Sequence, residues 1–382
     1  MREGPPKRRP WPGRVRPGHL AAAGGLVAGA LGLAAFLWCA TRKPTLAEAA
    51  RVAAQRAELP EGLVLSVAYA DGRGRVTALP VREGGRGWVR LHEAFGARSP
   101  TAGAALLGVD VARVRSEPAL GLEAAARLLA AAPGAPPAGR RGEPDGWDAA
   151  LRHFFGGRDA LAASLYADGV LRLWRQGFRG VDDEGAAFEA AAAGGAARAP
   201  ELPGLPAPAP AGAPGVPYVG ASGASHRPPE KPGPRPITHL IVHTTELPFA
   251  ATVGYFRAPR TGVGSHYGLR AQDGFAVQFI DEADVAFHDA CFNEHSVGIE
   301  HEAMSGAGRV WFSDELYRAS ARLVADIAAR RGIAPDREHI LGHGEAPDCS
   351  DHTDPGPDWD WGRYLRYVRE AYDAHPARAA PR

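Results

Sequence analysis

The sequence predicts an α/β sheet domain over residues 237–375 and a mostly α-helical domain over residues 44–193. Short apolar runs alternate with a helical pattern in the first of these stretches, whereas three- and four-residue apolar spacing fills the second. Between them, residues 194–236 are rich in Pro, Ala and Gly, as in an extended, weakly ordered linker. A chain of 382 residues has material for two cores. The net charge of +1 gives a nucleic-acid partner no support, and we expect a monomer.

The first 43 residues combine a basic segment with an apolar run. Residues 20–40 carry no charge, and the segment before them is basic, with Lys7, Arg8, Arg9, Arg14 and Arg16 among its side chains. At about 1.5 Å per residue, this run just spans a hydrocarbon core of about 30 Å. Trp38 stands where signal cleavage needs a small residue. We therefore expect an uncleaved transmembrane anchor with the rest of the chain exported to the cell envelope, periplasmic or extracellular; secretion after signal cleavage is the alternative.

The helical domain is predicted from three amphipathic segments, TLAEAARVAAQRA, LGLEAAARLLAAA and DALAASLYADGVLRLWRQGF. In the C-terminal domain, ITHLIVHTT, HYGLRAQ, FAVQFI, HSVGIEHEA and EHILGHGE indicate strands. Asp273-Gly274 predicts a hairpin turn between the second and third of these strands. A helix is expected over residues 314–330, with Ser313 as N-cap and Gly332 after its end. Residues 376–382 form a short tail.

Histidines concentrate in the C-terminal domain. Eleven of the 14 lie between residues 226 and 375. His243, His266 and His343 stand at predicted strand ends, where functional groups of α/β domains gather. A catalytic zinc takes three protein ligands, commonly imidazoles and carboxylates, plus one water. The histidines and the acids near residue 350 therefore indicate a metal site.

The ordered segments IVHTT, SHYGL, SVGIEHE, GHGE and TDPGPDWDW resemble the type-2 zinc N-acetylmuramoyl-L-alanine amidases, which are related to peptidoglycan recognition proteins. The resemblance spans residues 237–372 and implies a mixed β-sheet flanked by helices. It also implies that His243, His343 and Asp354 hold Zn²⁺ and that Glu300 is the acid-base residue. His352 stands where the family often has lysine, and it is the candidate stabiliser of the oxyanion.

Three points of this assignment stay open. Cys349 and Asp348 compete with Asp354 for the third zinc position, since thiolate is a good zinc ligand. Glu302 lies on the same strand face as Glu300, so strand geometry does not choose between them. A disulfide between Cys291 and Cys349 is neither required nor excluded. We assign the cleft around the substrate to three further side chains: His266, Tyr267 and His288.

The helical domain contains the segments LPEGLVLSVAYADGRG, LLGVDVARVRSEPALGLEAAARLLAA and GWDAALRHFFGG. With them, residues 46–173 resemble the lysozyme-like fold of lytic transglycosylases. That family ends the corresponding helix with Glu followed by Ser, whereas this chain has Asp71-Gly72. A shorter carboxylate is misplaced by about 1 Å, which can cost about 100-fold in rate. Glu93 is a weaker candidate for the acid. We expect a domain that does not cleave glycan and acts as a binding or spacer domain.

Together these resemblances imply a peptidoglycan hydrolase that uses zinc-activated water to cleave the amide between N-acetylmuramic acid and L-alanine. One alternative is a non-catalytic peptidoglycan-binding protein of the same fold. Such proteins lose zinc ligands, whereas this chain has a suitable residue at all three ligand positions. Another is a cytosolic amidase acting on soluble muropeptides, which the predicted anchor opposes. The expected partners are peptidoglycan or muropeptides, and a membrane through residues 20–40.

Overall fold

The computed structural model describes residues 42–78, 86–196, 198–231, 233–346 and 351–379. Residues 45–382 form one compact unit by their internal contacts. Within the described ranges, none of the helices has the length and apolar character that crossing a bilayer requires. The predicted anchor, residues 20–40, lies outside these ranges.

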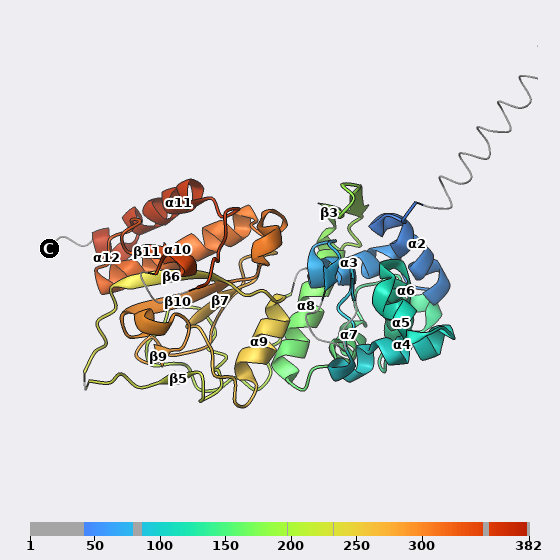
Figure 1. Cartoon of the computed structure of the whole chain (residues 1–382), viewed down its shortest axis with the longest axis horizontal. Coiled ribbons are helices and arrows are strands. Elements are labelled where there is room, and N and C mark those ends of the chain that lie inside the picture. The colour runs from blue at the N-terminus through green and yellow to red at the C-terminus, as the bar shows by residue number, and fades with distance from the viewer. Residues whose placement is uncertain (1–41, 79–85, 197, 232, 347–350, 380–382) are drawn as a thin grey trace, which may run out of the picture. The chain divides into compact units, whose positions relative to one another are not determined.

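The N-terminal part of the unit is helical, as predicted (Figure 1). Its longest helix, α8, is buried along most of its length, and α3 is apolar on nearly all sides. A two-stranded hairpin, β3–β4, follows α8 and was not predicted. The elements are α2 (Leu46–Ala57), α3 (Glu61–Gly72), β1 (Thr77–Ala78), β2 (Arg86–Gly87), η1 (Glu93–Arg98), α4 (Pro100–Leu107), α5 (Val111–Ser116), α6 (Pro118–Ala130), η2 (Ala138–Arg140), α7 (Asp148–Phe155), α8 (Ala160–Gln176), β3 (Phe178–Val181) and β4 (Ala187–Ala190).

The C-terminal part contains a five-stranded mixed sheet in the order β11-β6-β10-β7-β8. The first four strands run parallel, and β8 pairs antiparallel with β7 across the predicted Asp273-Gly274 turn. Gly274 has φ 68°, which the hairpin turn requires. The elements are β5 (His226–Arg227), β6 (His239–Thr244), α9 (Phe249–Arg257), β7 (Tyr267–Leu269), β8 (Ala276–Gln278), β9 (Val285–Ala286), η3 (Ala290–His295), β10 (Ser296–His301), η4 (Ser305–Val310), α10 (Asp314–Arg331), β11 (Ile340–Gly342), η5 (His343–Glu345), α11 (Trp361–Asp373) and α12 (Pro376–Ala379).

Side-chain alternation divides this sheet into two faces. Leu240 and Val242 of β6, with Val297 and Ile299 of β10, share an apolar core with α10 and α11. Successive residues of a strand point to opposite faces. His243 and Glu300, which are register partners on neighbouring strands, therefore project from the face away from α10 and α11. That face carries the candidate site.

Helix α10 begins and ends where the sequence predicts. The Ser313 hydroxyl accepts a hydrogen bond from the Leu316 backbone N–H, and Gly332 has φ 71° after the last turn. On the opposite face of the sheet from the site, His301 donates from Nδ1 to the His243 carbonyl at 3.0 Å and accepts from Ser320 of α10 at 2.7 Å. Helix α10 thereby supports the strand that presents His243.

The prediction of a weakly ordered linker is wrong for residues 211–236. Val219 is fully buried, and Tyr218 makes a parallel bridge with Gln278 of β8. Strand β5 pairs with β9, and Arg235 donates to the carbonyls of Asn293 and Ser296. Such a segment shows no periodic pattern because its order comes from hydrogen bonds to a sheet edge and from a few buried side chains.

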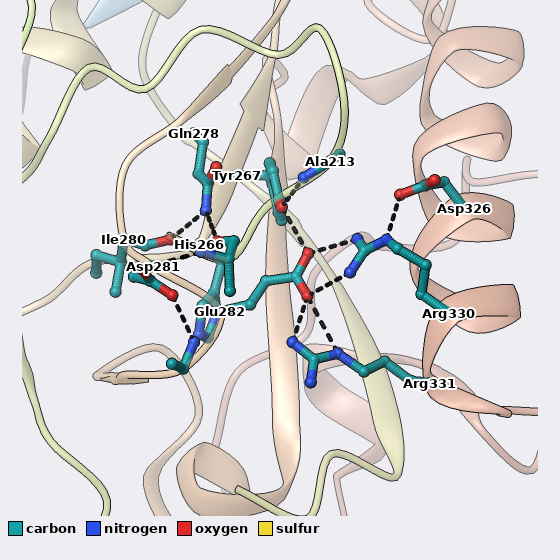
Figure 2. A network of polar contacts seen from close by, with 12 residues as sticks. Ala213, His266, Tyr267, Gln278, Ile280, Asp281, Glu282, Asp326, Arg330 and Arg331 are labelled. Atoms are coloured by element: carbon teal, nitrogen blue, oxygen red, sulfur yellow. Dashed lines mark hydrogen bonds and ion pairs between the residues drawn. The ribbon is translucent and has the colours of Figure 1, made fainter. Parts of the chain in front are cut away.

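A buried carboxylate connects this segment, the hairpin and α10 (Figure 2). Glu282 is fully buried and accepts hydrogen bonds from Tyr267, Arg330 and Arg331. The Tyr267 hydroxyl also accepts from the backbone N–H of Ala213 at 2.8 Å. Burial alone would raise the pKa of Glu282, but the arginine and tyrosine hydrogen bonds outweigh it and lower this pKa to about 2.

Candidate active site

Two histidines and an aspartate converge at the carboxyl ends of β6 and β11. His243 ends the apolar part of β6, His343 follows β11 directly, and Asp354 comes from the loop before α11. Their ligand atoms all lie within 4.8 Å of one another, and all three residues are buried. The three residues that the resemblance assigns to one metal site therefore lie close together. In the part of the chain that the structure describes, this is the one such group of three.

The glycines of the GHGE segment allow this convergence. A Cβ at Gly342 would lie 2.7 Å from Pro355 Cδ, and one at Gly344 would lie 2.6 Å from the His352 carbonyl oxygen. Any larger residue on either side of His343 would therefore push away the loop that carries Asp354. The backbone N–H of Thr244 then donates to Asp354 Oδ2 at 3.2 Å and orients the carboxylate.

The donor set fits a tetrahedral zinc ion. His243 Nδ1 and His343 Nδ1 are 3.0 Å apart, and they lie 3.4 Å and 3.1 Å from the oxygens of Asp354. Ligand atoms about 2.0–2.1 Å from a tetrahedral ion are separated by about 3.3 Å. Burial lowers the pKa of His243, which favours the neutral imidazole that binds metal. Asp354 has a strongly lowered pKa because the close contacts with His243 and His343 outweigh the effect of its burial.

Beside this group, Glu300 and the three ligands line a pocket of about 560 Å³. Glu300 Oε2 is buried and has no hydrogen-bond partner among the described residues. Burial raises the pKa of Glu300 well above its usual value, and the charges of Asp354 and Glu246 add to this effect. A carboxyl without a partner, held in a pocket with a raised pKa, is suited to proton transfer.

His352 also lines the pocket. Its ring stacks on His343 with centroids 4.0 Å apart, and its Nδ1 lies 3.5 Å from Asp354 Oδ1. The side chain is 59% exposed, so it faces the open side of the pocket where substrate enters. The contact of His352 with the developing oxyanion stays a prediction.

Of the three predicted cleft residues, the structure places only His288 in the pocket wall. His266 is fully buried and contacts Arg235 and the Gly298 N–H, and burial lowers its pKa to about 3. Tyr267 is also fully buried, and Glu282 accepts its hydroxyl hydrogen. The assignment of His266 and Tyr267 to substrate contact is therefore corrected: both are interior polar residues. Sequence could not separate them from pocket residues, because neighbouring strand positions carry similar residue types.

Several pocket residues were not singled out from the sequence. Asp289 and Asn293 line the pocket on its inner side, next to His288. Tyr255 and Val263 line it on the outer side and are about half exposed. The segment FHDACFNEH lacks any periodic pattern, and only its density of polar residues next to a predicted strand could have pointed to it.

The rival ligands Cys349 and Asp348 lie outside the described residues. Cys291 takes part in a disulfide bond. The chain has only two other cysteines, Cys39 and Cys349, and both also lie outside the described residues. Within the described part, Asp354 fills the third position of the ligand group.

Comparison with known proteins gives the same family for the C-terminal part. Residues 233–357 match the model of the family described as N-acetylmuramoyl-L-alanine amidase. N-acetylmuramoyl-L-alanine amidase A of Achromobacter lyticus is 30% identical over 145 residues, which cover 34% of this chain and 81% of the relative. The chain belongs to the N-acetylmuramoyl-L-alanine amidase family, and its function is that of a peptidoglycan amidase.

Solved structures of amidases are also similar to this part of the chain. The amidase AmiD from E. coli, in complex with the substrate anhydro-N-acetylmuramic acid-L-Ala-D-gamma-Glu-L-Lys, is 25% identical, with a TM-score of 0.30. The match covers 37% of this chain and 61% of AmiD. AmpDH3 from Pseudomonas aeruginosa, in complex with anhydromuramic pentapeptide, is 20% identical, with a TM-score of 0.30, over 37% of this chain and 63% of AmpDH3.

Proposed function

We propose that the chain is a zinc-dependent hydrolase of the amide bond between N-acetylmuramic acid and L-alanine in peptidoglycan. The observation that carries the proposal is the position of Glu300. Its carboxyl group lines the same pocket as the ligand group His243, His343 and Asp354, and its Oε2 has no hydrogen-bond partner among the described residues. A zinc ion bound by these three residues supplies a Lewis acid for water and for an amide carbonyl.

The chain's own residues then have distinct roles. Glu300 accepts the proton that water loses as it adds to the amide carbon, and it returns this proton to the departing amine. His352 donates a hydrogen bond to the oxyanion of the tetrahedral intermediate from the exposed side of the pocket. Tyr255 and Val263 offer exposed apolar surface at the pocket for the sugar or the stem peptide.

The helical part supports a non-catalytic role. Asp71, the candidate acid of a lysozyme-like domain, is 1% exposed. Its carboxylate accepts from Arg98 Nη1 at 2.9 Å and from the Arg90 backbone N–H at 2.9 Å. A buried carboxyl group whose oxygen accepts from two donors is not accessible to a glycosidic oxygen. The weaker candidate, Glu93, accepts from Thr101 and Arg115 and is likewise engaged. We propose that this part positions the amidase on glycan and does not cleave it.

The test uses the chain from Thr45 to Arg382, because one apolar cluster contains side chains of both its helical part and α9. Purified protein is expected to bind one zinc ion and to release stem peptides from sacculi, and a chelator should stop this release. His243→Ala and His343→Ala should each lose both zinc and activity. Binding to sacculi without release of peptides, in zinc-loaded protein, would instead favour the non-catalytic alternative.

We further propose that the protein is exported and held at the membrane by residues 20–40. The charge-free run after a basic segment supports this location. Fractionation of cells that express the full chain should find it in the membrane fraction, and removal of residues 1–43 should release it. Full-length protein in the cytosol would contradict the proposal.

A further inference from the structure

The two histidine ligands present their outer ring nitrogens to two consecutive residues. Nδ1 of His243 and Nδ1 of His343 face Asp354, so Nε2 of each ring points away from the ligand group. His243 Nε2 lies 3.0 Å from His288 Nδ1, and His343 Nε2 lies 3.6 Å from Asp289 Oδ1. The dipeptide His288-Asp289, between β9 and η3, therefore lies next to the outer nitrogens of both histidine ligands.

On the His243 side, a chain of hydrogen bonds has only one possible direction. The Phe292 carbonyl can only accept, so the Ser296 hydroxyl donates to it at 2.7 Å. Ser296 Oγ then accepts from His288 Nε2 at 3.2 Å, which leaves His288 Nδ1 as an acceptor. His243 must therefore carry its proton on Nε2, and the lone pair of Nδ1 faces the ligand group.

On the His343 side, the acceptor is a carboxylate without other partners. Asp289 has a fully buried side chain, and neither of its oxygens has a hydrogen-bond partner among the described residues. Such a group is costly unless it is paired. The separation of 3.6 Å from His343 Nε2 exceeds a hydrogen bond by about 0.4–0.6 Å, which a small rotation of either side chain closes. Asp289 does not itself belong to the ligand group of three.

The dipeptide is held in place from behind. Asn293 Oδ1 accepts from the backbone N–H groups of His288 and Asp289 at 2.9 Å and 2.7 Å. Gly298 of β10 leaves space for the His288 ring, because a Cβ there would lie 2.6 Å from its Cγ. These contacts limit how far the two side chains can move from the ligands.

We infer that His288 and Asp289 are positioning residues that hold the proton of each histidine ligand on Nε2 and so prepare both Nδ1 atoms to bind a divalent cation. The inference rests on the proposed zinc site. A carboxylate that accepts from the outer nitrogen of a metal-bound imidazole makes the ring a stronger ligand, and loss of such a partner weakens metal binding by about 10- to 100-fold. Asp289 supplies this contact to His343, and His288 transmits the orientation of Ser296 to His243.

The test measures Zn²⁺ affinity by competition with a chromophoric chelator, in the metal-free chain from Thr45 to Arg382. Asp289→Ala and His288→Ala are each expected to weaken affinity by about 10- to 100-fold. Asp289→Asn keeps a neutral acceptor and should fall between Asp289→Ala and wild type. His288→Asn places an amide oxygen near the position of Nδ1 and should recover part of the loss. Asp284→Asn, a charge change on the same segment that pairs with His226, is the matched control.

Nitrogen NMR of the metal-free protein provides a second readout that needs neither metal nor activity. Wild type should show His243 and His343 as neutral rings protonated on Nε2, and Asp289→Ala should mix the two tautomers of His343 alone. If wild type binds zinc but Asp289→Ala keeps its affinity within 2-fold and the tautomer of His343 is unchanged, the inference fails while the metal site stands. If wild type binds no zinc, the proposed function itself fails.

Discussion

Two glutamates separated by one residue have opposite surroundings. Glu300 lines the pocket, and within the described part of the chain nothing donates a hydrogen bond to its Oε2. Glu302, just beyond the end of β10, accepts from the backbone N–H groups of Phe249 and Ala271 at 2.8 Å and from Arg73 at 3.4 Å. The first is available for chemistry, whereas the second holds the ends of three segments together.

Substitution of each glutamate by glutamine should separate these roles. Glu300→Gln keeps the size of the side chain but removes the proton acceptor, so turnover of muropeptide should fall about 10²- to 10⁴-fold while zinc content is unchanged. Glu302→Gln should keep most of its activity per folded molecule. Because it weakens charged hydrogen bonds to buried donors, it should lower the free energy of unfolding by about 1.5–3 kcal/mol. If Glu302→Gln is inactive and Glu300→Gln is active, the proposed assignment of the acid-base role to Glu300 is wrong.

Among elements, the end of α3 is joined to η1 by a buried ion pair. Asp71 and Arg98 are 2.9 Å apart, with side chains 1% and 3% exposed. The Arg98 guanidinium also lies 5.2 Å from the centre of the Tyr166 ring of α8. By the resemblance to lysozyme-like domains, Asp71 stands at the position of their catalytic acid. In this chain its carboxylate connects α3 with η1.

Asp71→Asn should therefore affect folding without removing an activity. The substitution removes the negative charge that faces the buried Arg98 guanidinium, and breaking a buried ion pair costs roughly 3–5 kcal/mol of unfolding free energy. Release of stem peptides, measured below the melting transition, should stay near that of wild type. Wild type and Asp71→Glu should both release no glycan fragments from sacculi. Detection of new glycan ends with wild type would overturn the non-catalytic role.

At the scale of the whole C-terminal part, the Glu282 network makes stability depend on pH (Figure 2). The carboxylate has a pKa of about 2 in the folded protein, below the value of about 4.3 for an exposed glutamate. A lowered folded-state pKa contributes stability that is complete above the unfolded pKa and is lost as pH falls towards the folded pKa.

Glu282→Gln should accordingly lower the free energy of unfolding near pH 7 by roughly 3 kcal/mol. The difference from wild type should shrink between about pH 4.5 and about pH 2, where the wild-type carboxylate itself takes up a proton. Denaturant titrations of both proteins across this range provide the measurement. A difference that stays constant with pH would show that the carboxylate charge does not provide the stabilisation. Glu315→Gln on the outer surface of α10 is a suitable control.

Much of the fold and of the ligand group could be predicted from the sequence. Strands β6, β10 and β11, the β7–β8 hairpin and the ends of α10 follow from local patterns: apolar runs, a turn dipeptide and capping residues. The set His243, His343 and Asp354 was also available, because it lies in short segments whose order and residue types resemble those of one family. These features depend on residues close together in the chain.

Only the tertiary structure decided the rest, because it depends on contacts between residues far apart in sequence. The Pro-rich segment 211–236 is ordered by a sheet edge that forms elsewhere, and His266 and Tyr267 are interior because distant arginines and Glu282 surround them. The resemblance already favoured Glu300, but only the structure shows that Glu302 accepts hydrogen bonds from backbone N–H groups of two other segments. The contacts of His288 with His243 and of Asp289 with His343 also join residues far apart in sequence. No local pattern predicts which side chains a folded loop will contact.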